Sequence, residues 1–251
     1  MITHYIWIIL KRDMKLFLRQ NSLLIGAVVF PLILLLFIGF GFEKIINMEK
    51  LGLSYLEFLS PGIIVLFSVS SALSVGYNIF YDKESNFIKE ILVSPIPRSA
   101  IVLGNAVLGI MWVLVTFIIL AIILPLIVGN FSISSIISSI PILILLAITF
   151  SSLGLLMGFL SKSSANLGTL VGYINMPLFF LSGAFFPVSS LPLWLKIFAY
   201  INPFYYGIDA IRYFSTGFSE ISLPISYIVL TLFTLILAGI STILFEKKST
   251  N

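Results

Sequence analysis

The residues 99–161, SAIVLGNAVLGIMWVLVTFIILAIILPLIVGNFSISSIISSIPILILLAITFSSLGLLMGFLS, run for 63 positions without an Asp, Glu, Lys or Arg. An apolar bilayer core about 30 Å thick is crossed by roughly 20 helical residues, each of which rises about 1.5 Å. The run is therefore too long for one crossing. Its polar interruption at 129–141, GNFSISSIISSIP, divides it into two predicted crossings, near 100–128 and 139–160.

The whole chain is more apolar than soluble domains are. Of its 251 residues, 59% are hydrophobic and 10% are charged, whereas about a quarter of the residues of a soluble domain are charged. The chain contains no cysteine and a single histidine, His4. Disulfides, thiolate metal sites and a histidine-based metal centre are therefore excluded, and a polytopic membrane protein is the first expectation.

Four further apolar runs predict four further crossings. They do not alternate apolar and polar residues as the strands of a membrane barrel do, so we expect helices. The first run is longer than the apolar core of a signal peptide, and we expect it to remain as an uncleaved crossing. The predicted fold is all-α, with one transmembrane domain over residues 1–251 and six spans at about 23–42, 58–81, 100–128, 139–160, 166–187 and 223–245.

The basic residues predict which side of the membrane each segment faces. Six spans place both termini on one side, together with segments 82–98 and 161–165. That side holds ten of the 14 basic residues. Because basic residues resist translocation, it is predicted to be cytoplasmic. We therefore expect a multi-pass protein of the plasma membrane with both termini in the cytoplasm.

One charged segment, DKESNFIKEILVSPIPR at 82–98, interrupts the apolar chain between the second and third spans. Asp82 is of a type that caps a helix N-terminus, and prolines at 95 and 97 end a helix. Between them, one predicted face is apolar and consists of Phe87, Ile88, Ile91 and Leu92. This short amphipathic helix either lies flat on the lipid surface or docks into a cytoplasmic partner.

Small residues at helical spacing predict where spans approach one another. The fourth span carries Gly154-x-x-x-Gly158 and the fifth carries Gly168-x-x-x-Gly172. Glycines at this spacing allow the backbones of membrane helices to come close. We expect these four glycines to serve in helix packing, with a substrate-lining role as the alternative.

The segment 186–220 is predicted to face outward. Eight aromatic residues lie between Trp194 and Phe214, and such side chains concentrate at the headgroup level. Breaks at Pro187, Pro192 and Asn202-Pro203 predict two short helices rather than a seventh span. Asp209 and Arg212 are three positions apart and can pair. We expect a re-entrant cap with a neutralising ion pair. A role at an outer gate is the alternative, with the candidate residues Asn202, Pro203, Tyr206, Asp209 and Arg212.

Two stretches resemble a known family. DKESNFIKEILVSPIPRSAIVLGN, residues 82–105, resembles the loop after the second span of ABC-2 type transporter permeases, close to the branch that exports drugs, polysaccharides and lipids. LSGAFFPVSSLPLWLKIFAYINPFYYGIDAIRYF, residues 181–214, resembles the segment before the last span of the same family. The chain departs from the family pattern at Asn86, where Gly is common, and at Asn105, where Lys is common.

The resemblance implies a mechanism. Two copies of such a permease form the pore, and each copy binds one ATP-binding-cassette (ABC) ATPase, which carries the ATP and Mg²⁺. It further implies an amphipathic N-terminal interface helix and a cytoplasmic coupling helix that inserts into the ATPase. The implied ATPase-contact residues are Asp82, Lys83, Glu84, Phe87, Ile88, Ile91, Leu92 and Pro95.

The partners and cofactors follow from the same resemblance. We expect a homodimer, with a heterodimer of related permeases as the alternative, and contact with lipids but not with nucleic acid. The chain has no G-x-x-x-x-G-K-[ST] loop to cradle phosphates, so no cofactor is expected to bind to this chain.

The acidic residues of the chain bear on two other function classes. An ion-coupled carrier, or a channel, often keeps an ionisable residue at mid-bilayer. A membrane-embedded lipid-modifying enzyme needs acidic or histidine side chains to assemble its site. No Asp or Glu is central in any predicted span. We therefore expect an exporter permease that is not an enzyme.

Overall fold

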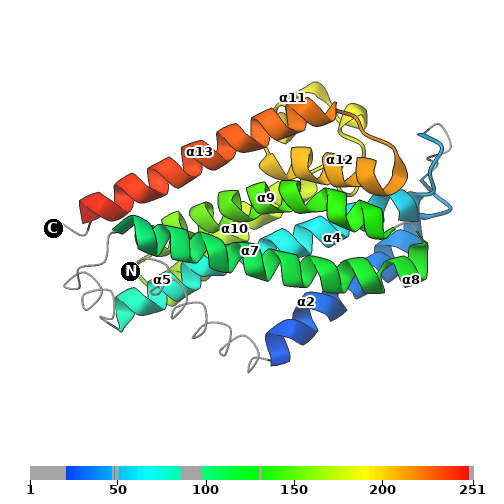
Figure 1. Ribbon diagram of the computed structural model, residues 1–251. Helices are drawn as coiled ribbons and strands as arrows, with labels where there is room; N and C mark the ends of the chain where they lie inside the picture. The colour runs from blue at the N-terminus through cyan, green and yellow to red at the C-terminus, as the bar shows by residue number, and fades with distance from the viewer. Residues whose placement is uncertain (1–20, 47, 49–50, 86–97, 130–131, 249–251) are drawn as a thin grey trace.

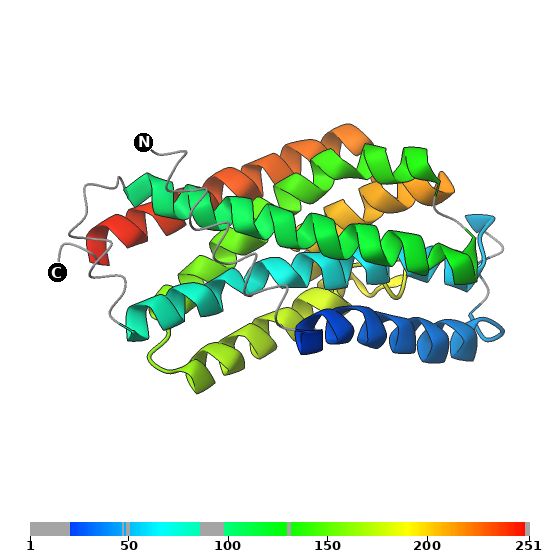
Figure 2. The same cartoon turned by 60° about the horizontal axis from the view of Figure 1, so that its bottom comes forward.

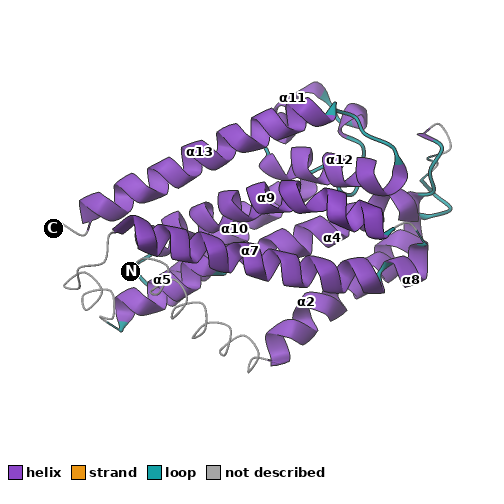
Figure 3. Cartoon of the chain, in the orientation of Figure 1, coloured by secondary structure: helices purple, strands orange, loops and turns teal. Residues whose placement is uncertain are grey.

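The computed structural model describes residues 21–46, 48, 51–85, 98–129 and 132–248. Over these residues the chain is a bundle of helices without strands (Figures 1 and 3). The all-helical prediction is therefore confirmed.

The long helices follow one another along the chain. The first comprises α2 (Asn21–Leu34), a π-helical turn, η1 (Leu35–Gly39), and α3 (Phe40–Phe42). The second comprises α4 (Tyr55–Leu73) and α5 (Val75–Glu84), and the third comprises α7 (Arg98–Ile123) and α8 (Pro125–Val128). Then come α9 (Ile133–Leu160) and α10 (Ser164–Phe180). Three short helices follow, η3 (Val188–Ser190), α11 (Leu193–Tyr200) and α12 (Pro203–Thr216), and α13 (Leu223–Lys248) is last.

Four helical segments within the described residues are long and apolar enough to cross a membrane. They are Tyr55–Tyr81, Leu103–Val128, Ile133–Leu160 and Leu223–Leu244. The apolar helix Val28–Phe42 is shorter, and α10 has 17 residues. These findings are consistent with a polytopic membrane protein, and four of the six predicted crossings have full spanning length.

Successive helices reverse direction, so the connections gather at two ends of the bundle (Figures 1 and 2). The end of α5, the start of α7, the α9–α10 turn and the end of α13 lie at one end. The α8–α9 connection and the segment that contains α11 and α12 lie at the other. The end of α5 and the start of α7, which flank residues 86–97, thus lie opposite the aromatic segment.

The fourth and fifth helices have other bounds than the predicted spans at about 139–160 and 166–187. The fourth helix begins at Ile133 because Ser132 caps it, its side chain accepting the Ser135 N–H at 3.1 Å. The serines that suggested a loop instead make hydrogen bonds, since the Ser135 hydroxyl donates to the Phe214 carbonyl at 2.7 Å. The fifth helix ends at Phe180 rather than 187, and the chain soon turns at Gly183, whose φ is +70°.

The second crossing begins before the predicted residue 58 and has a break. A capping box starts α4, because Ser54 accepts the Glu57 N–H at 3.2 Å and the Glu57 carboxylate accepts the Ser54 N–H at 2.8 Å. The helix is interrupted at Ser74, which separates α4 from α5. It then continues through Asp82 to Glu84, so Asp82 does not stand at the N-terminus of a new helix.

The core lies around α4, which packs against α7, α9 and α12. Its side chains Phe58, Leu59, Ile63 and Leu66 are fully buried. Phe150 of α9 and Phe204 of α12 stack with their ring centroids 4.1 Å apart. The short helix α12 is therefore an internal element of the bundle rather than a surface attachment.

Candidate functional site

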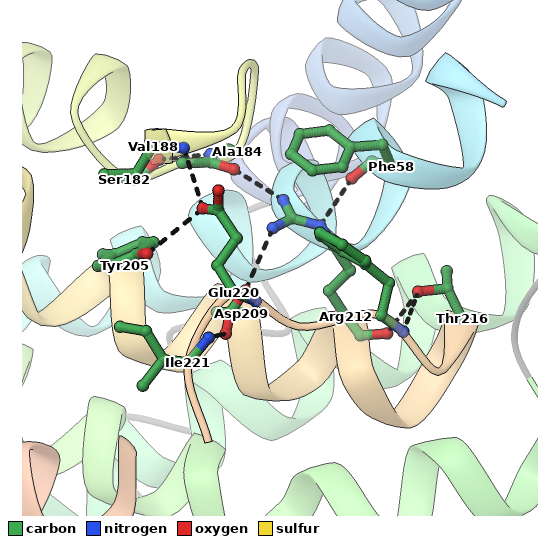
Figure 4. Close-up of polar contacts among 12 residues, drawn as sticks. Phe58, Ser182, Ala184, Val188, Tyr205, Asp209, Arg212, Thr216, Glu220 and Ile221 are labelled. Atoms are coloured by element: carbon green, nitrogen blue, oxygen red, sulfur yellow. Dashed lines mark hydrogen bonds and ion pairs between the residues drawn. The ribbon is translucent and has the colours of Figure 1, made fainter. Parts of the chain in front are cut away.

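The most polar buried region of the described chain lies where α12 meets the start of α4. We call residues 181–221 the outer cap, after the prediction that segment 186–220 faces outward; it contains η3, α11 and α12 and returns the chain from α10 to α13. Figure 4 shows the polar contacts that it makes. Two charged side chains inside it, Asp209 and Arg212, have no exposed surface.

Arg212 joins three separate parts of the chain. Its Nε donates to the carbonyl oxygen of Phe58 in α4 at 3.1 Å, and its Nη2 donates to the carbonyl oxygen of Gly183 at 2.7 Å. Its Nη1 lies 3.8 Å from Oδ1 of Asp209, one turn earlier in α12. The guanidinium carbon lies 3.8 Å from the centre of the Phe58 ring, which adds a cation–π contact.

Asp209 fixes the loop that follows α12. Its Oδ1 accepts the Glu220 N–H at 2.9 Å, and its Oδ2 accepts the Ile221 N–H at 2.9 Å. Burial raises the pKa of Asp209, whereas the Glu220 amide and the Arg212 guanidinium act in the opposite direction. Burial lowers the pKa of Arg212 to about 10, so that this side chain still carries its proton at neutral pH.

Glu220, near the end of the outer cap, is hydrogen-bonded to residues near the beginning of the cap. Its carboxylate accepts the Val188 N–H at 2.9 Å and the Ser189 N–H at 3.0 Å. It also accepts the Tyr205 hydroxyl at 3.3 Å. Burial and the neighbouring Glu220 raise the pKa of Tyr205 far above its usual value, so the phenol remains a donor. Sequence reasoning missed Glu220, Phe58 and Gly183, since two of these act through backbone carbonyls that no motif marks.

The other predicted cap residues also make defined contacts. Asn202 caps α12 by accepting the Phe204 N–H at 3.0 Å, and its amide donates to the Leu178 carbonyl of α10 at 2.7 Å. Pro203 occupies the first helical position of α12. The Tyr206 hydroxyl donates to the Tyr200 carbonyl at 2.8 Å. The structure thus brings all five predicted residues into α12 or its cap.

The aromatic residues of this segment divide into two groups, contrary to the prediction of one headgroup cluster. Trp194, Phe198, Tyr200 and Tyr213 are exposed, whereas Phe204, Tyr205 and Tyr206 are buried. Trp194, Phe198 and Tyr200 belong to α11, which lies outside the bundle, and the buried residues belong to α12, which packs against α4 and α9. Tyr213, near the end of α12, is exposed. The prediction of two short helices is confirmed by α11 and α12.

Three of the eight residues predicted to contact an ATPase are described, and they lie at the opposite end of the bundle. Asp82, Lys83 and Glu84 form the last turn of α5, and Glu84 is exposed. Phe87, Ile88, Ile91, Leu92 and Pro95 lie outside the described residues, as does the N-terminal segment 1–20. The predicted coupling and interface helices therefore stay predictions.

The four predicted packing glycines differ in what surrounds them. A side chain on Gly154 would meet the Leu73 carbonyl oxygen at 2.7 Å, and one on Gly158 would collide with the Gly76 carbonyl. A side chain on Gly168 would meet the Tyr77 hydroxyl at 3.5 Å, whereas one on Gly172 would meet nothing within 4 Å. The first pair thus lies in a close crossing of α9 with α4 and α5, and Gly172 faces open space in the single chain.

These hydrogen bonds and the ion pair hold separate segments of the chain together. The charges of Asp209 and Arg212 are largely satisfied by one another and by the backbone. Within the described ranges, no group of three His, Cys, Asp or Glu side chains could hold a metal ion. The arrangement can fix segments relative to one another, and it lacks the free acid or base that a reaction would use.

Comparisons with known proteins agree with one another. A family model described as ABC-2 type transporter matches residues 4–216. The chain is 32% identical over 219 residues to ycf38 of Porphyra purpurea, which is named as a transport permease; the match covers 83% of this chain and 74% of that protein. It is 29% identical over 242 residues to the inner membrane transport permease YadH of Escherichia coli strain K12, covering 92% and 91%. Nodulation protein J of Bradyrhizobium diazoefficiens is 26% identical over 214 residues, covering 83% and 80%.

Proposed function

The chain belongs to the ABC-2 type transporter family, and from this we propose that it is the membrane-spanning permease subunit of an ATP-driven exporter. Two copies would form the translocation path, and each would be driven by a separate ABC ATPase that carries the ATP and Mg²⁺. The observation that carries the proposal is the family match over most of the chain, together with relatives that are named transport permeases.

Six crossings of the plasma membrane with cytoplasmic termini form part of the proposal. The proposal takes the four full-length spans, together with the shorter Val28–Phe42 and α10, as these six crossings. The end of α5, the start of α7, the α9–α10 turn and the end of α13 share one end of the bundle (Figure 1). The proposal assigns segments 1–22 and 82–98 to the same side as this turn and the end of α13, and together these segments hold ten of the 14 basic residues, which supports placing that side in the cytoplasm.

The second crossing supplies a direct connection between the proposed ATPase contact and the outer cap. It runs from Tyr55, beside the cap, to Glu84, where the charged insert begins. A continuous helix transmits displacement from one end to the other. In this crossing the helix is continuous on either side of the break at Ser74. Residues 83–92 would act as the coupling helix, whose apolar face enters a groove of the ATPase and whose charges select the partner.

The exposed surface of the single chain supports a second copy. The exposed residues of α13 are strongly apolar and suit lipid, as at Ile228 and Leu235, which are 60% and 66% exposed. At the break between α4 and α5 and on α10, by contrast, Ser74, Thr169 and Tyr173 are exposed. Because polar side chains in membranes tend to lie between helices rather than against lipid, the α5–α10 face suits a dimer interface and a hydrated path.

The experiment that tests this function is a pull-down of the tagged chain from its native membranes. We expect an ATPase with a phosphate-binding loop to copurify, and Phe87→Asp or Ile91→Asp to abolish that association while membrane insertion is kept. Asn86→Asp adds the same charge to the predicted polar face and serves as the control. If the Phe87 variant still captures the ATPase, the coupling-helix assignment is wrong. If the purified chain transports without any ATPase, an ion-coupled carrier is favoured instead.

A further inference from the structure

We infer that Arg212 is a positioning residue for transport: it fastens the outer cap to α4, so that the cap and α4 move as one rigid body when the transporter changes state. The inference rests on the proposed function, because it concerns motion during the transport cycle. It goes beyond that function by assigning a role to one side chain.

The contacts of Arg212 join two segments of the chain that are far apart in sequence. Its two carbonyl partners, Phe58 and Gly183, belong to different segments, α4 and the start of the cap. The planar guanidinium presents several donors in a fixed fork, so one side chain bridges both carbonyls. A lysine has the same charge but lacks this fork. The bridge therefore depends on arginine in particular rather than on positive charge.

The cost of burying Arg212 indicates a purpose other than stability. Its side chain has no exposed surface, and Nη1 makes no hydrogen bond with the described residues. Replacing a buried ion pair by well-packed apolar residues is often neutral or stabilising. Stability alone thus does not account for an arginine at this position. A fixed geometry between α4, the loop at Gly183 and α12 does account for it.

Close packing around the bridge leaves no space for the cap to slide on α4. A side chain on Gly62 of α4 would meet the Ala184 Cβ at 2.7 Å and its Cα at 2.8 Å. The Phe58 and Phe218 rings have centroids 6.4 Å apart. Glu220 ties the end of the cap back to Val188 and Ser189 near its beginning. The cap is therefore closed on itself and locked to the outer part of α4.

Motion that enters from the cytoplasmic end must then be taken up nearer to that end. The second crossing is interrupted at Ser74, between α4 and α5, so this is where the helix is broken. Short irregular positions commonly absorb the backbone rotation in hinge motions. The rigid body would extend from the cap through α4 and end at this break.

The test uses intrachain distances measured by pulsed electron paramagnetic resonance. The chain contains no cysteine, so spin labels can be placed at Ser71→Cys in α4 and Ser190→Cys in the cap. The labelled chain is diluted with unlabelled chain and reconstituted with its ATPase in lipid nanodiscs. We expect a narrow distance distribution with the same mean without nucleotide and with trapped ATP. A second pair, Tyr81→Cys with Ser190→Cys, spans the break and should shift between the two states.

Substitution of Arg212 should release the cap. In R212Q, and more weakly in R212K, we expect the Ser71–Ser190 distribution to broaden without nucleotide and its mean to shift between states. A purely structural role would broaden it equally in both states without a state-dependent shift. Tyr206→Phe, which removes a hydrogen bond within the cap, is the control and should behave as the unmodified chain does. If R212Q does not assemble, Phe58→Leu removes the ring beneath the guanidinium and should give a smaller effect in the same direction.

Two results would overturn the inference. One is a Ser71–Ser190 mean that shifts between states in the unmodified chain. The other is a distribution whose mean does not shift between states in R212Q, whether its width is unchanged or is broadened equally in both states; Phe58→Leu takes the place of R212Q where that variant does not assemble. A failure of the proposed function is distinguishable, because then no ATPase assembles or the Tyr81–Ser190 pair does not respond to nucleotide. In that case, the width of the Ser71–Ser190 distance distribution without nucleotide would still show whether Arg212 holds the cap against α4.

Discussion

Gly76 of α5 lies so close to the backbone carbonyl of Gly154 in α9 that a side chain on Gly76 would overlap it. Gly158, one turn further along α9, lies equally close to the carbonyl of Gly76. The two helices therefore cross backbone against backbone, directly beside the break at Ser74. This crossing fixes the point about which any motion of α5 relative to α4 would take place.

Gly158→Leu is expected to destabilise the protein strongly, because the new side chain must push the α5 backbone away from α9. Overpacking of this kind costs typically about 1–3 kcal/mol, and the obstacle here is backbone that cannot rotate aside. Gly239→Leu in α13 is the matched control, since a side chain there meets nothing within 4 Å and the exposed face of α13 suits lipid. The measurement is the loss of the folded fraction on heating in detergent, followed by size-exclusion chromatography. Equal stability of the two variants would contradict the close crossing.

Asp209→Asn is expected to lower the free energy of unfolding by about 3–5 kcal/mol, because it leaves the buried Arg212 charge without its partner. One of the two backbone N–H groups that Asp209 accepts would also face an amide donor instead of an oxygen. Tyr206→Phe removes one neutral hydrogen bond from the same helix and should cost only about 0.5–1.5 kcal/mol. The loss of the folded fraction on heating in detergent compares Asp209→Asn with Tyr206→Phe. The account of the pair fails if the Asn variant is no less stable than the Phe variant.

The helices and the cap helices could be predicted from sequence, because both depend on local signals. Long apolar runs predicted the crossings, and Pro187, Pro192 and Asn202-Pro203 predicted the breaks at which η3, α11 and α12 begin. The early start of α4 also had a readable signal, the capping box of Ser54 and Glu57. That signal precedes the apolar run, and the run alone places the start of the crossing at residue 58.

The depth of α12 could not be predicted, because it depends on tertiary packing. Its aromatic residues match the composition of a headgroup cluster, yet Phe204 and Tyr205 pack inside the bundle. The spacing of Asp209 and Arg212 allowed a pair to be expected, but the partners that make Arg212 a bridge are carbonyl groups at Phe58 and Gly183. They lie 154 and 29 positions away in the chain, and any residue type supplies a carbonyl.

The proposed topology predicts opposite labelling of the two ends of the bundle. Ser190 is exposed in the outer cap, and Lys162 is exposed in the α9–α10 turn at the other end. Because the chain has no cysteine, Ser190→Cys and Lys162→Cys each give a single reactive thiol. A membrane-impermeant maleimide should label Ser190→Cys in intact cells and label Lys162→Cys only after permeabilisation. The reverse pattern would invert the proposed orientation, and labelling of both in intact cells would contradict the single crossing by α10 that is proposed between them.

Thr149 of α9 and Thr234 of α13 are expected to stabilise the contact between these helices through one shared hydrogen bond. Their hydroxyl oxygens are 2.8 Å apart, and each also lies 2.8 Å from a carbonyl of its own helix, at Leu145 and Leu230. The Thr234 hydroxyl also lies 3.3 Å from the Leu145 carbonyl, a longer contact across the same interface. Two hydroxyl protons serve these contacts, so one hydroxyl donates across the interface while the other donates to its own helix.

A double-mutant cycle with Thr149→Val and Thr234→Val isolates this bond, because valine keeps the shape and removes the hydroxyl. Interhelical hydrogen bonds in membranes average about 0.6 kcal/mol, with a maximum of about 1.7 kcal/mol, and we expect an interaction energy in that range. The cycle of Thr149→Val with Thr231→Val is the control, since the exposed Thr231 hydroxyl bonds only to Tyr227 of its own helix. Its interaction energy should be near zero, because distant sites without shared partners add independently. Additive effects in the first cycle, measured by reversible unfolding in mixed micelles, would show that the two hydroxyls do not share a hydrogen bond.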